Sequence, residues 1–329
     1  MSEPTRVAIA CQGGGSHTAF TAGVLRGLLE NWDDDYELVG ISGTSGGAFN
    51  ALATWYGVVT ADYAATAELL ESLWMSLATD GTVDRVANAW LVGASRVDNS
   101  GLPIARVSPY SVPGPEWGKE RIRSVLERHV DFDAIPDLCQ RTVPELVVGT
   151  VNVNAGEFET FTNEDVTTEA VLASAAVPNL FEAVEIHGHL HWDGLFSQNP
   201  PIDDLLTVDA ERKPEELWVI QINPQRRDGE PRSLEEIADR RNELSGNISL
   251  NQELRFVERV NRWIEEGRLP ADRFSRVTVR RIEMGRALPA PTKLDRSRPF
   301  IRELLEAGEA RAAEFRDGLR ADDPEDATP

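Results

Sequence analysis

The stretch GISGTSGGAFNAL (40–52) places a serine between glycines at the junction of two apolar segments. The preceding YELVGIS (36–42) has the unbroken apolar character of a buried strand. The following AFNALATWY (48–56) predicts a helix that ends at Gly57. Ser45 therefore lies on the turn from strand to helix, where glycines permit unusual backbone angles and close approaches. This is the G-x-S-x-G arrangement, in which a strained turn presents a serine hydroxyl at a helix N-terminus.

Strand-like and helix-like segments alternate along most of the chain. Strands are expected at 7–12, 145–153, 157–163, 184–192, 216–224 and 277–284, with 145–163 forming a hairpin, and helices at 18–30, 61–78, 119–130, 166–176 and 298–319. Two further helices are expected to begin at capping boxes, Ser233-x-x-Glu236 and Ser249-x-x-Gln252. The alternation predicts an α/β protein with three layers, α/β/α, around a largely parallel central sheet.

The chain divides by composition into three parts. Residues 5–224 carry the alternating pattern, 225–320 are predicted to form a mostly helical C-terminal extension packed on the same domain, and 321–329 to form a disordered acidic tail. Within the first part, residues 90–117 combine apolar side chains with four prolines and lack a regular period. This region is predicted to be either a packed connecting loop or a lid beside Ser45.

The charge of the chain is strongly acidic. Its 329 residues include 55 acidic and 33 basic side chains, giving a net charge of −22, and only Lys119, Lys213 and Lys293 are lysines. Such self-repulsion is typical of halophilic proteins, whereas a base-composition bias would explain the lysine deficit but not the acidity. The charge argues against a nucleic-acid partner, since no basic patch stands out, and against charge-driven attachment to anionic lipid.

Localisation is predicted from three absences in the sequence. The two cysteines, Cys11 and Cys139, do not make a disulfide framework. No apolar run approaches the roughly 18 residues of a transmembrane segment. The N-terminus lacks the features of a secretory signal. Together these predict a cytoplasmic protein without a transmembrane segment, of unknown oligomeric state.

A serine nucleophile needs a base, and the histidines do not supply an obvious one. None of the five lies after residue 191, so the late histidine of the α/β-hydrolase order is missing. Asp193 instead follows an apolar strand and precedes Gly194. Because the carboxyl ends of parallel strands gather at one edge of a sheet, Asp193 and Ser45 are expected to lie at the same edge.

With these residues in place, the chain resembles the patatin-like phospholipases and lipid acyl hydrolases from about residue 6 to 224. Four blocks occur in the family's order: CQGGGSHTAFTAGVL (11–25), GTSGG (43–47), ASAAVPNLFEAVEI (173–186) and WDGLFSQNPP (192–201). The resemblance includes the branch that acts on intracellular polyhydroxyalkanoate. It implies a patatin-like fold, a Ser–Asp dyad that needs no histidine, and no cofactor.

The resemblance assigns a role to each site residue. Ser45 attacks an ester carbonyl and Asp193 takes its proton, for which burial should raise the aspartate pKa from about 3.9. Backbone N–H groups of Gly13, Gly14, Gly15 and Gly46 are expected to form the oxyanion hole. The sequence departs from the family's pattern at three positions: His17 and Thr18 stand where a basic residue and a glycine are usual, and Leu195 where a smaller residue is common.

Two parts of the sequence allow other interpretations. A phosphate-binding loop at GGGSH (13–17) would lack the P-loop lysine and spacing. His187, His189 and His191 alternate along the expected strand in phase with Asp193, which would suit a metal, but no metal site is predicted. The predicted partner is a lipid or polyester acyl ester at a membrane or granule surface. The alternatives are a polyhydroxyalkanoate depolymerase with the same dyad, a metal-dependent hydrolase that uses the three strand histidines, and a non-catalytic lipid- or granule-binding protein.

Overall fold

The computed structural model describes residues 3–99, 108–111, 114–139, 143–178, 180–208, 212–270 and 273–322. Within them a single sheet has the strand order β5-β6-β3-β2-β1-β7-β8, with β4 paired to β3 on the side. The strands are β1 (Thr5–Cys11), β2 (Tyr36–Thr44), β3 (Glu145–Asn152), β4 (Glu157–Thr162), β5 (Val184–Ile186), β6 (His189–Asp193), β7 (Glu216–Gln221) and β8 (Thr278–Glu283).

The central strands are parallel and the outer additions on one side are antiparallel. The strands β3, β2, β1, β7 and β8 run in one direction. The strands β4 and β6 each pair antiparallel with β3, and β5 pairs antiparallel with β6. The carboxyl ends of β1 and β2 therefore lie side by side, which brings the glycine loop after Cys11 next to the serine after Thr44.

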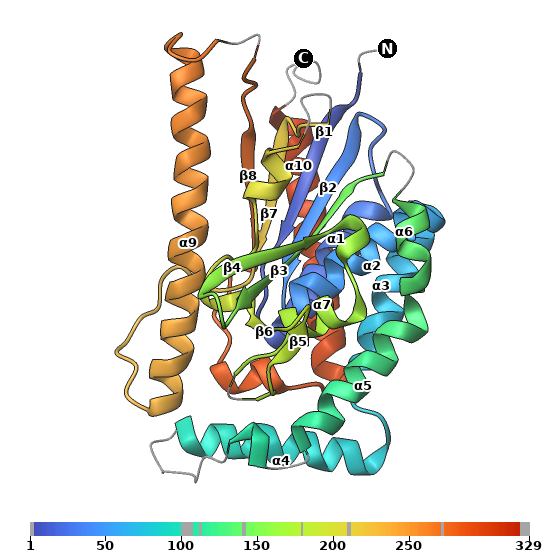
Figure 1. Cartoon of the computed structure of the whole chain (residues 1–329), viewed down its shortest axis with the longest axis vertical. Coiled ribbons are helices and arrows are strands. Elements are labelled where there is room, and N and C mark those ends of the chain that lie inside the picture. Colours follow the sequence, from blue (N-terminus) through green and yellow to red (C-terminus); the bar gives the residue numbers. More distant parts are fainter. Residues whose placement is uncertain are drawn as a thin grey trace.

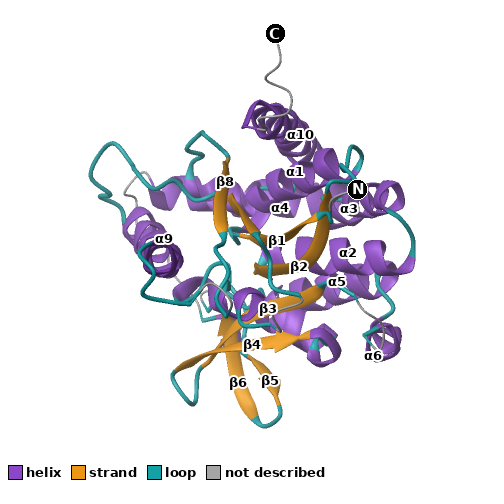
Figure 2. Cartoon of the chain, turned by 90° about the horizontal axis from the view of Figure 1, so that it is seen from above, coloured by secondary structure: helices purple, strands orange, loops and turns teal. Residues whose placement is uncertain are grey.

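Helices cover both faces of this sheet (Figures 1 and 2), so the three-layer prediction is confirmed. The helices on one side of the sheet share a single large core: α1 (Ala19–Leu29), α2 (Gly46–Thr60), α3 (Tyr63–Leu77), α5 (Gly114–His129), α6 (Ile135–Leu138), α7 (Thr168–Ser174) and α10 (Arg298–Asp322). The other face packs against α8 (Asp203–Leu206) and α9 (Leu234–Glu265). The helix α4 (Gly81–Asn99) lies across the lower end of the molecule in Figure 1.

Each face of the sheet has its own hydrophobic core, because successive side chains of a strand point to opposite faces. On β1, Val7 and Ile9 enter the larger core with α1 and α2, whereas Ala8 and Ala10 enter the smaller core with α8 and α9. The central strands are therefore apolar on both faces, which explains the unbroken apolar runs of the sequence.

The C-terminal segment packs closely on the N-terminal half. The helices α1 and α10 meet at glycines: a Cβ atom on Gly23 would lie 2.0 Å from the Leu305 carbonyl oxygen, and one on Gly308 would lie 2.2 Å from the Phe20 carbonyl oxygen. Side chains at these positions would separate the helices. The strand β8 extends the sheet at its edge by pairing with β7.

Three local predictions were wrong. The expected strand 184–192 is a hairpin of β5 and β6, whose turn contains His187 and Gly188, both with positive φ. The helix α2 does not end at Gly57 but continues to Thr60. The second capping box does not start a helix, because Ser249 lies inside α9, a single helix of 32 residues that begins after the predicted cap Ser233.

The region expected to be irregular is partly a helix. Of residues 90–117, the first ten belong to α4 and the last four to α5, whereas 100–107 and 112–113 lie outside the described residues. The predicted acidic tail lies outside them from residue 323 onward. In the part of the chain that is described, no helix is both long enough and apolar enough to cross a bilayer.

Candidate active site

Ser45 occupies a sharp turn that only glycine neighbours allow. It joins β2 to α2 with a φ of 58° and a ψ of −129°, and its φ is unusual for a residue with a side chain. A Cβ atom on Gly43 would lie 2.2 Å from the Gly47 carbonyl oxygen, and one on Gly47 would lie 2.2 Å from the Cys11 carbonyl oxygen. The glycines of the motif are therefore required by packing within the turn and against β1.

Ser174 fixes the backbone of the turn. The Ser45 N–H donates to the Ser174 Oγ at 2.9 Å, and that hydroxyl donates to the Gly149 carbonyl oxygen on β3 at 2.7 Å. Ser174 is fully buried at the end of α7. Its role was not predicted from the sequence, although a lone polar residue in the alanine-rich stretch 173–176 was a usable signal.

Asp193 lies beside the same turn but comes from a different strand. It is the last residue of β6, lies opposite Thr150 of β3, and is fully buried. Its Oδ1 accepts a hydrogen bond from the Leu195 N–H at 2.9 Å, whereas Oδ2 has no hydrogen-bond partner among the described residues. A Cβ atom on the next residue, Gly194, would lie 3.0 Å from the Thr44 Cγ2, so this segment packs directly against the residue before Ser45.

Burial determines the protonation of Asp193. It raises the pKa of the carboxyl group from 3.8 to about 7, and the Ser45 hydroxyl and the Leu195 N–H oppose the rise. The hydroxyl thus acts on the carboxylate, although its approach is looser than a regular hydrogen bond, as is common in enzymes without substrate. A carboxylate with this pKa exchanges protons near neutral pH.

The glycine loop lies directly beside Ser45. A Cβ atom on Gly13 would lie 2.8 Å from the Ser45 Cβ. The Gly13 N–H donates to the Asn199 Oδ1 at 2.6 Å and is therefore occupied. The N–H groups of Gly14, Gly15 and Gly46 have no hydrogen-bond partner among the described residues. These three members of the predicted oxyanion set remain available to a ligand.

Four buried amides hold the loop in place. The Gly13 carbonyl oxygen accepts from the Asn223 Nδ2 at 3.0 Å and from the Asn199 Nδ2 at 3.2 Å. The Gln12 Oε1 accepts from the Asn223 N–H at 2.8 Å, and the Gln12 Nε2 donates to the Asn247 Oδ1 at 2.9 Å. None of these four side chains was predicted as a site residue, and only Gln12 and Asn199 lay in the quoted blocks.

His17 stands where a basic residue was expected, but it does not supply a positive charge. Its side chain is buried, and its Nε2 lies 2.7 Å from the Thr292 Oγ1. Burial and, secondarily, the nearby Lys293 lower the His17 pKa to about 3, so the ring is neutral. Thr18 instead fills the space beside Gly46, whose Cβ atom would lie 2.0 Å from the Thr18 Oγ1.

The three strand histidines do not form a row. His187 lies in the β5–β6 turn and is exposed, so the predicted alternation is wrong at that position. On β6, His189 is exposed and His191 is buried, with its Nε2 3.0 Å from the Glu159 Oε2. No group of three or more histidine, cysteine or acidic side chains that could hold a metal ion occurs among the residues described.

Comparison with known proteins gives one family. The model of the family described as "Patatin-like phospholipase" matches residues 9–206, which include the glycine loop, Ser45 and Asp193. No curated protein matches the chain significantly.

Two solved structures resemble the chain at low identity. The crystal structure of VipD from Legionella pneumophila is 13% identical, with a TM-score of 0.43 over 96% of this chain and 67% of that one. The structure of the heterodimeric complex ExoU–SpcU from the type III secretion system of Pseudomonas aeruginosa is 12% identical, with a TM-score of 0.38 over 96% of this chain and 52% of that one. At these values the two structures carry no information on activity or substrate.

Proposed function

Because the chain belongs to the patatin-like phospholipase family, we propose that it hydrolyses acyl esters of lipids through a Ser45–Asp193 dyad. One observation carries the proposal: a fully buried aspartate, with its pKa raised to about 7, packs against the turn that presents Ser45. A general base is most effective when its pKa lies near the working pH. No histidine is needed for this chemistry.

The reaction proceeds in two halves. The Ser45 Oγ attacks the ester carbonyl while its proton moves to the unpartnered Oδ2 of Asp193. The negative charge that develops on the carbonyl oxygen accepts hydrogen bonds from the N–H groups of Gly14, Gly15 and Gly46. The tetrahedral intermediate then expels the alcohol, which takes the proton from Asp193. Water, deprotonated by the Asp193 carboxylate, hydrolyses the acyl-enzyme and restores Ser45.

The N-terminus of α2 supports the same step. This helix begins at Gly46, and its first N–H groups face the turn that carries Ser45. The positive end of the helix dipole stabilises negative charge that develops there. Because Asn199 and Asn223 clamp the Gly13 peptide, the loop on the other side needs little reorganisation when the charge forms.

Covalent labelling tests whether the dyad exists. A fluorophosphonate probe should label the full-length protein at Ser45, and labelling should disappear in Ser45→Ala and fall strongly in Asp193→Asn. The variant Ser111→Ala, which changes an exposed serine, is the matched control and should label normally. Normal labelling of Asp193→Asn would contradict the dyad, and absence of labelling in the unaltered protein would favour a non-catalytic lipid- or granule-binding protein.

Turnover identifies the substrate. Phosphatidylcholine vesicles, a short-chain nitrophenyl ester and amorphous polyhydroxybutyrate should be assayed side by side with the unaltered protein and with Ser45→Ala. We expect Ser45-dependent release of fatty acid from the lipid. Release from the polyester alone would instead assign the protein as a polyhydroxyalkanoate depolymerase with the same dyad.

A further inference from the structure

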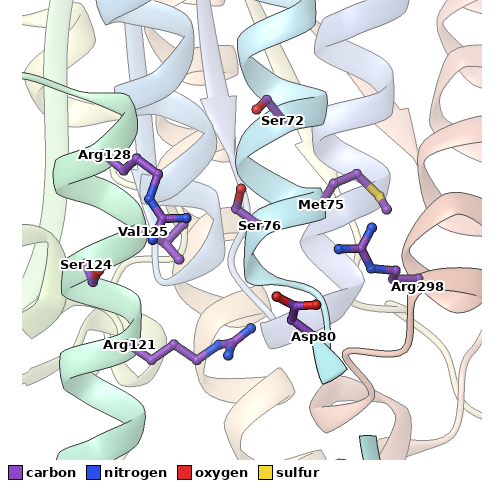
Figure 3. Close-up of a pocket in the computed structure, with 9 residues that line it drawn as sticks. All are labelled: Ser72, Met75, Ser76, Asp80, Arg121, Ser124, Val125, Arg128 and Arg298. Atoms are coloured by element: carbon purple, nitrogen blue, oxygen red, sulfur yellow. The ribbon is translucent and has the colours of Figure 1, made fainter. Parts of the chain in front are cut away.

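A pocket of about 450 Å³ lies outside the site described above, between α3, α5 and the beginning of α10. Figure 3 shows its polar lining: Arg121, Ser124 and Arg128 from α5, Ser72 and Ser76 from α3, and Arg298 from α10. Three arginines converge here in a chain of net charge −22.

Helical spacing explains the convergence. Arg121, Ser124 and Arg128 are three and four residues apart and therefore share one face of α5. Ser72 and Ser76, four residues apart, share the facing side of α3. In Figure 3 the two α5 guanidinium groups reach toward α3, and that of Arg298 approaches from the opposite side.

The positive charge in the pocket is only partly neutralised. Arg128 and Arg298 form no ion pair with any described carboxylate, and Asp80 is the single acidic side chain of the lining. Arg121 forms an ion pair with Asp84 at 3.3 Å, but its Nε is buried and has no hydrogen-bond partner among the described residues. Arg121 also donates through Nη2 to the Ala78 carbonyl oxygen at 2.9 Å, and Arg298 through Nε to the Thr79 carbonyl oxygen at 3.4 Å. The other guanidinium donors of Arg298, and those of Arg128, have no acceptor among the described residues.

The N-terminus of a long helix adds to the positive electrostatic potential of the pocket. Arg298 is the first residue of α10, which has 25 residues, so the positive end of the helix dipole lies at the pocket. Serine hydroxyls complete the lining. The His129 Nδ1–H donates to the Val125 carbonyl oxygen at 2.8 Å, and the Nε2 of the same ring lies 3.2 Å from the Ser72 Oγ, so the Ser72 hydroxyl already has a partner.

We propose that this pocket binds a phosphate group. Several planar guanidinium forks with hydroxyl donors and a helix N-terminus form the recurring recognition set for phosphate. A carboxylate ligand would need only one of the three arginines, and the volume lies in the range of ligand sites. This site goes beyond the proposed hydrolysis and does not rest on it.

The phosphate can belong to a lipid headgroup or to a soluble ligand. A second pocket of about 650 Å³ shares Arg298 and Asp80 with the first and is lined in part by Ala89, Val92 and Pro299, which would suit an attached apolar chain. The segment before Arg298 also reaches the active site, because the Lys293 carbonyl oxygen would lie 2.4 Å from a Cβ atom on Gly15. A lipid phosphate held here would therefore bring a bilayer to the end of the molecule that carries Ser45.

The test uses full-length protein with the substitution Ser45→Ala, so that hydrolysis does not interfere. Binding of inorganic pyrophosphate is measured by calorimetry at low salt, with chloride at equal ionic strength as reference. Binding to phosphatidylcholine vesicles with and without phosphatidate is measured by flotation. Each measurement is repeated with Arg128→Gln/Arg298→Gln and with Arg302→Gln, an exposed arginine of α10 outside both pockets.

We expect the double variant to bind the phosphate probe about tenfold more weakly or worse, because two charge-assisted hydrogen-bonding groups are lost. The Arg302→Gln control should bind normally. Binding of pyrophosphate assigns a soluble phosphate ligand, and binding only to phosphatidate vesicles assigns a lipid headgroup. Binding of neither probe, or equal binding by the double variant, would overturn the proposal.

A measurement on the arginines themselves covers the case in which the double variant does not fold. Phenylglyoxal modifies exposed guanidinium groups, and mass spectrometry locates the modified residues. Whichever phosphate probe binds should protect Arg128 and Arg298 but not Arg302. Equal modification of all three in the presence of both probes would overturn the proposal without any substitution.

Discussion

Burying the ionised carboxylate of Asp193 costs folding free energy, and the same burial serves catalysis. The unfolded chain hydrates the carboxylate, whereas the folded protein holds it fully buried with one backbone N–H donor and a loosely placed hydroxyl. The ionised form is therefore disfavoured in the folded state, and the folded protein holds the proton more tightly than the unfolded chain does. The same shift makes the carboxylate basic enough to accept a proton from Ser45 near neutral pH.

The pH dependence of hydrolysis should report this group. Because only the ionised carboxylate accepts a proton, kcat/KM should rise with pH through about 7 and then level off. Steady-state kinetics on a soluble ester between about pH 5 and 9 measures it. A rate that stays constant across this interval would show that Asp193 is not the base. Replacing His187, His189 and His191 with alanine together should leave the profile in place.

Ionisation of the same carboxyl group should lower the stability of the folded protein. The pKa is 3.8 unfolded and about 7 folded, so stability falls as pH rises between these values and is constant above them. The lost stability above pH 7 amounts to about 4 kcal/mol. In Asp193→Asn this loss is absent, but the new amide N–H lacks a partner, which costs about 1–3 kcal/mol.

Urea denaturation of Asp193→Asn should therefore show a net gain of about 1–3 kcal/mol at pH 8, which reverses to a net loss of about 1–3 kcal/mol as the pH falls to about 4, where the parent regains its stability and the amide penalty remains. Ser45→Ala is the control, since it removes the same activity without removing the buried charge. A variant that is less stable than the parent at pH 8 would mean that Asp193 is better solvated than its position indicates.

At the scale of the elements, the oxyanion loop depends on segments that are distant in sequence. The loop itself follows β1, whereas its amide partners come from the segment after β6, the segment after β7 and the helix α9. Asn199 and Asn223 act through Gly13, and Asn247 acts through the Gln12 side chain. They are therefore positioning residues, and their loss should affect the transition state more than substrate binding.

Replacement of Asn199 tests this arrangement. Asn199→Ala removes the two hydrogen bonds that Asn199 makes to Gly13 and leaves only the one from Asn223, so the loop is held less firmly in its orientation. We expect kcat to fall by about 10- to 100-fold with KM changed little, since a misplaced oxyanion donor costs up to about 10³. Asn251→Ala, on α9, is the matched control. A rise in KM at constant kcat would indicate that Asn199 shapes the substrate site instead.

The sequence carried the parts of this site that depend on local pattern. The apolar runs and flanking glycines predicted the position of Ser45 on its turn, and the strand-end position predicted that Asp193 lies at the same edge of the sheet. The role of Asn247 could not be predicted, because its partner Gln12 lies 235 residues away in the sequence. No periodicity or motif encodes such a contact.

Two element errors have identifiable physical reasons. Apolar and polar residues alternate through 184–192, so the segment was predicted as one continuous strand. Gly188 could have indicated the turn, since a tight hairpin turn needs positive φ. At Ser249 the capping pattern was real, but the helix continues because Leu250, Leu254 and Val257 pack together against the sheet. Packing of an apolar face outweighs a local cap.

At the scale of the whole molecule, the acidic surplus acts against folding. The chain has 55 carboxylates and 33 basic side chains, so most of the surface repels itself at low ionic strength. Buried ion pairs respond differently. Glu243 of α9, whose side chain is 1% exposed, contacts Arg227 at 2.6 Å and Lys293 at 3.1 Å, and salt screens such pairs weakly. Added salt should therefore relieve the repulsion and leave these attractions in place.

The Tm should consequently rise as KCl increases from about 10 mM to about 1 M, over which the screening length falls from about 30 Å to about 3 Å. Most of the rise should occur below about 0.5 M, because repulsion between exposed carboxylates is already screened there. Sucrose at matched water activity is the control, since it favours the compact state without screening charge. A Tm that rises equally in sucrose would assign the effect to solvent exclusion. A flat or falling Tm in KCl would mean that opposite charges are interspersed closely enough on this surface for attraction to balance the surplus of 22 negative charges.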